Sequence, residues 1–196
     1  MIEFWFEFGS NYSYLSVMRI GALAAHHGVT VQWRPFLLAP IFKSFGWDSS
    51  PFVLQKEKGA YVWRDMERRS AKYGLPWVRP SHFPRRALLP MRVALIGADQ
   101  PWMEAYCQRI MQMNFVHDRE VDSPEVVSEV LAALNLPVAD ILAGAQSEAN
   151  KLALRHATEE AQARGIFGAP TFFAGNEMFW GDDRLEDALA WAAASA

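Results

Sequence analysis

The chain has almost no cysteine, and this scarcity excludes several kinds of chemistry. Cys107 is the single cysteine among 196 residues, so neither an internal disulfide nor a cysteine-built metal site can form. The five histidines show none of the spacings typical of metal ligands, and we expect no metal. We expect Cys107 to be a buried, inert thiol in the middle of a helix. A chain without disulfides is typical of the reducing cytoplasm, which is the compartment we predict.

An excess of charge of one sign and long apolar runs are also missing. Nineteen basic and 22 acidic residues leave a net charge of −3, which argues against nucleic acid as a partner because phosphate binding needs a basic excess. No apolar run reaches the ~18 residues of a membrane span, and residues 1–7 lack the basic start of a signal peptide. We therefore expect neither a nucleic-acid nor a membrane partner. The apolar residues, 51% of the chain, suffice for the core of one domain.

Apolar spacing predicts strands at both ends of the chain. Near the start, alternating residues indicate two strands around one amphipathic helix, which is a βαβ unit with parallel strands. Near the end, two short apolar runs joined by Gly175-Asn176 indicate a β-hairpin, which a helix follows. The predicted elements are strands over 2–8 and 30–36, a helix over 12–27, strands over 171–174 and 177–180, and a helix over 184–194.

The middle of the chain has helical spacing throughout. Five helices are predicted there: over 57–73, 86–96 and 102–116, from a start at Ser123-Pro124, and over 147–164. The full order of elements is that of a thioredoxin-like α/β domain into which helices have been inserted. We therefore assign residues 1–49 and 165–196 to a thioredoxin-like domain and residues 50–164 to an all-α helical insertion domain.

The start of the first predicted helix is the first candidate for chemistry. In a thioredoxin layout a C-x-x-C pair stands here, because the helix N-terminus stabilises a thiolate. Both positions are serine in this chain, Ser10 and Ser13, which excludes disulfide exchange. Ser10 or Asn11 could simply cap the helix; alternatively, the Ser10 hydroxyl donates a hydrogen bond to the sulfur of a bound thiol. The sequence alone leaves both interpretations open.

Two more motifs belong to the predicted hairpin and the helix after it. Proline before the third strand indicates a cis Ala169–Pro170 bond, which would present the Ala169 backbone to an extended peptide; a trans bond, the commoner state, is the alternative. At the start of the last helix, N–H groups can bind a carboxylate and an aspartate can hold an ammonium, although Asp182 could equally be an ordinary helix cap. Together the three motifs would bind a thiol, an extended residue and an amino-acid terminus. Glutathione contains all three.

Several stretches carry a resemblance to a known family. They are 6–15 (FEFGSNYSYL), 34–38 (RPFLL), 40–43 (PIFK), 59–65 (GAYVWRD), 165–173 (GIFGAPTFF) and, most specifically, 177–185 (EMFWGDDRL). On these the chain resembles the 2-hydroxychromene-2-carboxylate isomerases, relatives of kappa-class glutathione transferases within the DsbA-like thioredoxin group. The resemblance covers almost the whole chain and implies glutathione as cofactor, a homodimer, and a small aromatic carboxylate as substrate.

The resemblance also implies roles for individual residues. The glutathione sulfur would lie beside Ser10, and glutathione would be held by the Ala169 backbone and by Trp180, Gly181, Asp182 and Asp183. Substrate contacts would fall at Lys43, Val53 and Phe83.

The chain departs from the family at two of its positions. Asn11 stands where the family usually has proline, and Val53 stands where relatives have asparagine. The change at Val53 removes a polar contact, which can shift substrate specificity strongly. Outside these motifs, Lys43 could meet a substrate carboxylate or be a solvated loop lysine, and Arg85 and Arg86 could do the same or be a surface pair.

The function expected from these residues is a glutathione-dependent cis–trans isomerase. A thiolate that adds to a conjugated enone makes its double bond single for a moment, so that rotation can occur. A free thiol has a pKa near 8.5, and Ser10 and the helix N-terminus would both favour the anion. The alternatives are a kappa-type glutathione transferase and a thioredoxin-fold binding module without catalytic activity.

Overall fold

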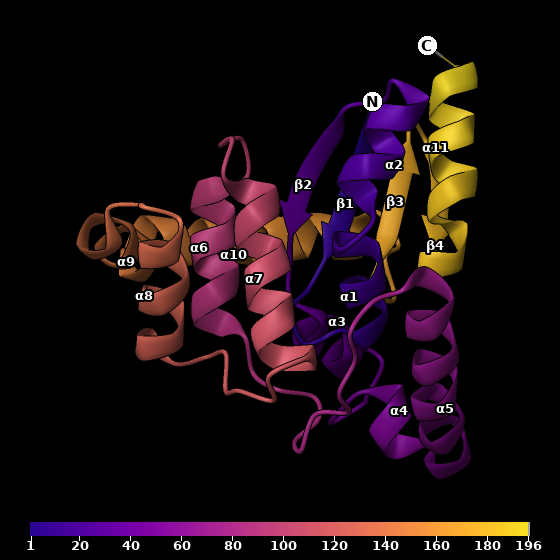
Figure 1. Cartoon of the computed structure of the whole chain (residues 1–196), viewed down its shortest axis with the longest axis horizontal. Helices are drawn as coiled ribbons and strands as arrows, with labels where there is room; N and C mark the ends of the chain where they lie inside the picture. Colours follow the sequence, from indigo (N-terminus) through magenta and orange to yellow (C-terminus); the bar gives the residue numbers. More distant parts are fainter. Residues whose placement is uncertain (196) are drawn as a thin grey trace.

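The computed structural model describes residues 1–195 and builds them around a four-stranded sheet (Figure 1). The strand order is β2-β1-β3-β4. Strands β1 (Ile2–Phe6) and β2 (Val31–Pro35) are parallel, whereas β3 (Thr171–Ala174) is antiparallel to both β1 and β4 (Glu177–Trp180). The sheet therefore confirms the predicted βαβ unit and hairpin, and both belong to a thioredoxin-like fold.

The helix predicted over 12–27 is wrong in one respect, because the chain forms two helices there. Helix α1 (Asn11–Val17) ends before Arg19, where φ is −120°, and helix α2 (Ile20–His27) begins after it. The Arg19 guanidinium lies 3.6 Å from the centre of the Tyr73 ring. The break at Arg19 therefore coincides with a tertiary contact to α5, which local helical spacing cannot reveal.

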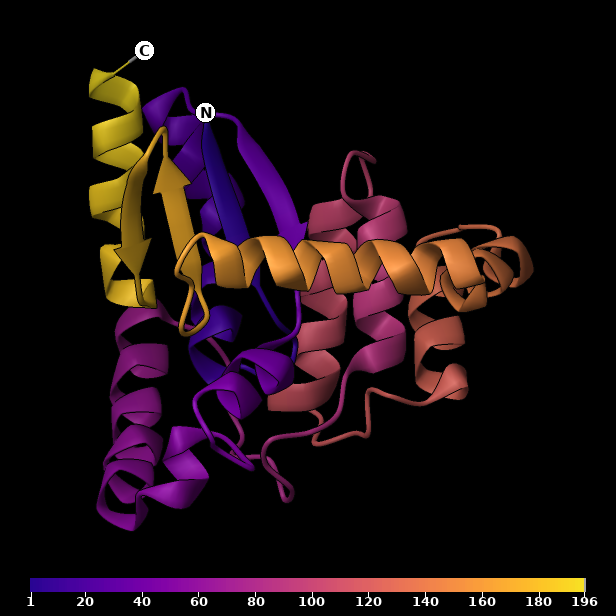
Figure 2. The same ribbon diagram turned by 180° about the vertical axis from the view of Figure 1, so that it is seen from behind.

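Helices cover both faces of the sheet. Helices α2 and α11 (Leu185–Ala194) pack on one face (Figure 1). Helix α10 (Glu148–Ala163) crosses the opposite face, and α3 (Leu38–Ser44) lies beside it (Figure 2). Phe4 and Phe6 of β1 are buried on the face that α2 and α11 cover. Trp5, which lies between them in sequence, packs with Phe36 and Phe173 on the opposite face. Alternate side chains of one strand thus supply two separate core layers.

The inserted helices form two groups. One group lies beside the β2 edge, and the other, α4 and α5, lies below α11 in Figure 1. The bounds are α4 (Pro51–Leu54), α5 (Lys56–Tyr73), α6 (Leu88–Gly97), α7 (Met103–Phe115), α8 (Pro124–Ala133) and α9 (Val138–Gln146). The five predicted helices are present, whereas α3, α4 and α9 are additional. Helices α3 and α4 have seven and four residues, too short for a periodic signal.

No helix in the described part of the chain combines the length and the apolar character needed to cross a bilayer. Residues of the sheet domain and of the insertion share the larger cluster of buried apolar side chains, which joins Phe4 and Leu185 to Val93 and Ile110.

Candidate functional site

A cavity of about 270 Å³ lies where β1 runs into α1. Four segments distant in sequence meet around it: the turn before α1, the loop between α3 and α4, the loop before α6, and the two ends of the β3–β4 hairpin. The lining residues that carry the argument are Glu7, Ser10, Asn11, Lys58, Phe83, Arg86, Phe167, Ala169, Trp180 and Gly181. The cavity therefore collects most of the residues that the three sequence motifs single out.

Ser10 both caps α1 and faces Ala169. Its Oγ accepts a hydrogen bond from the Ser13 N–H (3.2 Å), which confirms the capping interpretation. Its hydroxyl donates to the Ala169 carbonyl oxygen at 2.8 Å. A hydroxyl has one proton, so donation to a bound sulfur requires Ser10 to release Ala169.

The Ala169–Pro170 peptide bond is cis, as predicted. The carbonyl of Pro170 accepts from the Gly181 N–H at 3.0 Å, which ties this turn to the segment that follows β4. Within residues 1–195 the Ala169 N–H has no hydrogen-bond acceptor. This N–H, rather than the carbonyl held by Ser10, is the group left for an extended peptide. A second cis bond, Phe83–Pro84, was not predicted.

The Trp180–Asp183 motif divides between the cavity and the protein interior. Trp180 and Gly181 line the cavity. Asp182 is buried in the protein interior. Its Oδ2 accepts hydrogen bonds from Nη2 and Nε of Arg69, at 2.7 and 3.1 Å. Burial raises the pKa of Asp182 to about 6, and Arg69 opposes that rise. Asp183 is exposed and pairs with Arg184 at 3.2 Å. Asp182 is therefore neither a helix cap nor a free acceptor, because Gly181 is the cap of the short 3-10 helix that follows.

Trp180 forms one wall of the cavity together with Phe167. The centres of their rings are 4.8 Å apart, and Trp180 is 47% exposed. Gly168 lies directly beneath the indole, since a Cβ at this position would be 2.4 Å from Trp180 Nε1. Glycine is therefore required here for the tryptophan to lie flat against the turn.

The three predicted substrate residues lie in different places. Phe83 lines the cavity, 4.7 Å from Trp63 between ring centres. Lys43 on α3 and Val53 on α4 are exposed and do not line it, so their roles stay predictions. Lys58 and Arg86, both exposed, do line it.

Arg85 has a structural position rather than a ligand-binding one. Its side chain is buried, and its guanidinium donates to Asp118, Glu120 and the Asn114 side chain at 2.5, 2.8 and 3.0 Å. Arg86 is thus the member of the pair that is available to a ligand.

Two polar residues of the cavity were not predicted to belong to the site: Asn11, expected only as a possible helix cap and a departure from the family, and Glu7. Asn11 is 1% exposed, and neither polar atom of its amide has a partner within the described residues. Glu7 is partly buried, and burial raises its pKa to about 7, opposed by a hydrogen bond from the Leu38 backbone. The sequence contains a signal for Glu7. It is two residues after Trp5, so its side chain points to the same side of the strand, and it directly precedes the turn to Ser10.

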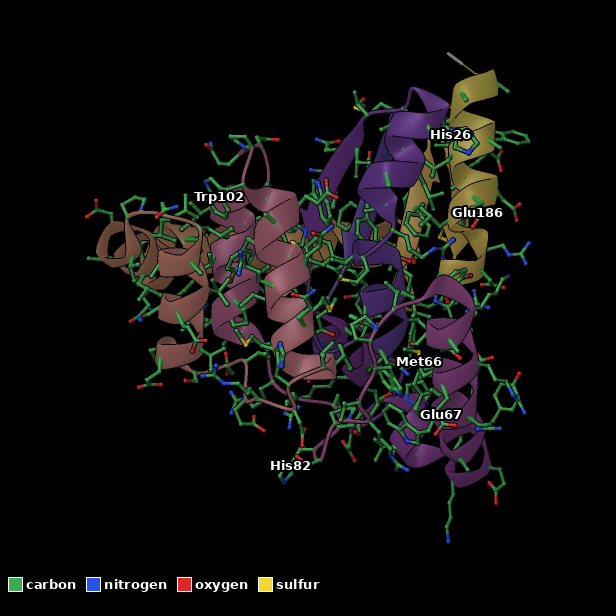
Figure 3. The ribbon with its side chains drawn as sticks, viewed as in Figure 1. His26, Met66, Glu67, His82, Trp102 and Glu186 are labelled. Carbon is green, nitrogen blue, oxygen red and sulfur yellow. The ribbon has the colours of Figure 1, made fainter. Side chains whose placement is uncertain are left out.

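The remaining candidates are not part of a second site. Cys107 is fully buried on α7, and burial raises the pKa of its thiol. Across residues 1–195 no group of histidine, cysteine, aspartate and glutamate has the arrangement of a metal site. Figure 3 shows His26 near one end of the molecule and His82 on a loop at the other.

Comparisons with known proteins agree with this architecture. The model of the DSBA-like thioredoxin domain family matches residues 1–190. A 2-hydroxychromene-2-carboxylate isomerase of Pseudomonas putida is 29% identical over 94% of this chain and 90% of its own length, and one of Sphingobium xenophagum is 29% identical over 94% of each. A solved structure of 2-hydroxychromene-2-carboxylate isomerase, 26% identical, superposes with a TM-score of 0.86 over 96% of this chain and 94% of that one. The chain therefore belongs to the DSBA-like thioredoxin family.

Proposed function

We propose that this protein is a glutathione-dependent cis–trans isomerase of 2-hydroxychromene-2-carboxylate or a related aromatic intermediate. The similarity to isomerases of that name over almost the whole chain supports this proposal. The observation that carries it is Ser10, which stands at the start of α1 against the cis Ala169–Pro170 turn and lines a cavity. In that place the chain has no thiol of its own, so the reacting sulfur must come from a bound molecule.

The residues around Ser10 fit glutathione as that molecule. The Ala169 N–H has no acceptor within residues 1–195 and suits the backbone of an extended peptide. Trp180 supplies a flat wall, and the N–H groups that follow Gly181 suit the carboxylate of an amino-acid terminus. Asp183, which is exposed and pairs with Arg184, is the more accessible carboxylate for the ammonium, because Asp182 is buried against Arg69.

Ser10 has the role of stabilising an anion. Bound glutathione would supply a thiolate that adds reversibly to the conjugated double bond of the substrate. The Ser10 hydroxyl would turn from Ala169 to donate to the sulfur, and a hydrogen bond to the charged form lowers the pKa of a thiol. The Ala169 carbonyl, which holds the hydroxyl otherwise, keeps this donor positioned.

Other residues that line the cavity suit an aromatic acid. Phe83 and Phe52 provide apolar surface, whereas Lys58 and Arg86 provide positive charge without an ion-pair partner among residues 1–195. Arginine and lysine complement a substrate carboxylate. Charge and apolar surface thus lie together, as an aromatic carboxylate requires.

The replacement of Ser10 by alanine tests the proposal. Ser10→Ala should lower the glutathione-dependent isomerisation rate at least about tenfold, because removal of one donor to an anion typically costs more than that factor. The matched control is Ser16→Ala, since Ser16 is buried in the same helix, its Oγ has no partner among residues 1–195, and it does not line the cavity. Full activity of Ser10→Ala would remove Ser10 from the mechanism.

A transferase would use the same activated sulfur but leave it attached to an electrophile. A chloronitrobenzene substrate distinguishes the two activities. Conjugation without isomerisation would replace the proposed isomerase by a kappa-type transferase, and neither activity together with no glutathione binding would indicate a binding module.

A further inference from the structure

Glu7 is the carboxylic acid nearest along the chain to Ser10. It follows the last residue of β1 and lines the same cavity as Ser10. The Ser10 N–H donates to the Glu7 carbonyl oxygen at 3.1 Å, so the turn into α1 begins at Glu7. A Cβ on Gly9 would lie 3.6 Å from Glu7 Oε2, which places the carboxyl group against the backbone that leads to Ser10.

The Glu7 carboxyl group has no charged partner. Within residues 1–195 no ion pair and no hydrogen bond from another side chain reaches it, and the backbone N–H of Leu38 is its hydrogen-bond donor. Its neighbours on the cavity wall include the apolar side chains of Leu38, Ala39 and Phe42. A carboxyl group in such surroundings favours its neutral, protonated form. In that form it can donate a proton.

We infer that Glu7 is the proton donor and acceptor for the substrate's carbonyl oxygen during isomerisation; this rests on the proposed function. The thiolate sulfur of bound glutathione forms a C–S bond at the far carbon of the substrate's conjugated double bond. The π pair of that double bond moves into the bond beside the carbonyl carbon, and the π pair of the carbonyl moves to its oxygen. The O–H bond of the Glu7 carboxylic acid breaks, and a new O–H bond forms on that oxygen. After rotation the Glu7 carboxylate takes the proton back, the double bond re-forms and the added nucleophile leaves with its electron pair.

Other ionisable groups of the cavity are less suited to this role. The Tyr12 hydroxyl is committed to Asp65 at 2.7 Å, and burial raises the pKa of Tyr12 further. Arg85 is held by its own acidic partners. Lys58 and Arg86 are exposed basic side chains, and Asp48 is an exposed carboxyl on the loop after α3. Glu7 is thus the partly buried acid among the charged groups that line the cavity.

The direction of the pH dependence follows from the neutral form being the donor. Burial raises the pKa of Glu7 from its usual 4.5 to about 7. The part of the isomerisation rate that depends on Glu7 should be fully present below about pH 6. It should fall about tenfold per pH unit well above pH 7. Thiolate formation has the opposite dependence, since it increases with pH.

The test compares Glu7→Gln with the matched control Glu3→Gln. Glu3 lies on the same face of β1 but outside the cavity, where it pairs with Arg34 and Arg164. Isomerisation rates are measured from about pH 5 to 9. Calorimetry measures glutathione affinity, and an infrared titration without glutathione detects the carboxyl group itself.

The expected result has three parts. Glu7→Gln should lower kcat about 100-fold at pH 6 and abolish the alkaline fall in rate. Its glutathione affinity should stay within about threefold of the wild type, because Glu7 acts on the substrate. The carboxyl signal that titrates near pH 7 should be absent in Glu7→Gln and present in Glu3→Gln.

Other outcomes would overturn the inference. A Glu7→Gln rate within about threefold of an active wild type, with the alkaline fall retained, would exclude Glu7 as the donor. If Glu7→Gln does not fold, Glu7→Asp replaces it: the alkaline fall should move to a different pH, and an unmoved fall would exclude Glu7. A wild type that isomerises nothing would overturn the proposed function and this inference together.

Discussion

Asp182 is the residue whose environment departs most from the pattern in the sequence. A Gly-Asp-Asp run before a helix predicts a cap or an ammonium ligand, yet Asp182 is buried and bonded to Arg69 of α5, with Arg19 at 3.8 Å. This ion pair fixes the segment that begins at Gly181, on the cavity wall. Asp182 therefore positions this segment rather than contacting a ligand.

Arg69→Ala should lower the free energy of unfolding by about 1–3 kcal/mol at pH 7, because it leaves the buried Asp182 carboxylate with only Arg19, 3.8 Å away, as a charged partner. Since the pKa of Asp182 in the folded protein is about 6, the loss should shrink as the pH falls through about 6, where folded Asp182 takes up a proton with or without Arg69. Urea denaturation measures both values. The control Arg64→Ala removes an exposed pair with Glu67 on the same helix and should change stability by less than about 1 kcal/mol. Equal effects of the two variants would refute a structural role for the buried pair.

Single residues were predictable where the chemistry of the motif determines the geometry. Ser10 capping α1 and the cis bond before Pro170 follow from residue type and position. Asn11 could not be recognised as an unpaired polar group of the site, because its burial and its lack of partners depend on segments distant in sequence. The same reason explains why Lys43, expected at the substrate, lies outside the cavity. Glu7 was not predicted although its place before the turn to Ser10 was a signal.

Helices α4 and α5 approach each other closely beside the cavity. Gly59 of α5 faces the backbone of α4, since a Cβ at Gly59 would be 2.1 Å from the Phe52 carbonyl oxygen. Phe52 in turn lines the cavity and packs 6.0 Å from Tyr12 between ring centres. Glycine at this position therefore allows α4 to close one side of the cavity.

Gly59→Ala should destabilise the protein by about 1–3 kcal/mol, because overpacking outweighs the helical preference of alanine. Chemical denaturation measures the change. Gly144→Ala is the control, since its Cβ would meet only the flexible end of Ile96 at 3.2 Å. That variant should be neutral or slightly more stable. A stabilised Gly59→Ala would show that α4 does not depend on this contact.

Elements were predictable where they are long and periodic. The hairpin strands have the predicted bounds, and α5 and α10 begin and end within one residue of the prediction. The break at Arg19 was not predictable from spacing, because the apolar positions on either side of it continue one helical pattern. The short helices α3 and α4 carry too few turns for a pattern, although they form much of the cavity wall.

The whole molecule brings four distant segments to one end of the sheet. The thioredoxin-like order of elements predicts that the turn before α1 and the turn before β3 meet, and the hydrogen bond from Ser10 to Ala169 confirms it. The inserted helices add the loop before α6 and the α4 wall to the same cavity. The order of helices and strands along the chain does not predict how the inserted helices pack against the thioredoxin-like part. The shape of the cavity is therefore known only from the structure.

Calorimetric titration of the full chain with glutathione tests the account most directly. Because the cavity has Ser10 where a thiol would otherwise stand, we predict saturable heat with one tripeptide bound per chain, and weaker binding by Ser10→Ala than by Ser16→Ala. The absence of heat at millimolar glutathione would contradict the claim that this protein acts through a sulfur atom supplied by its ligand.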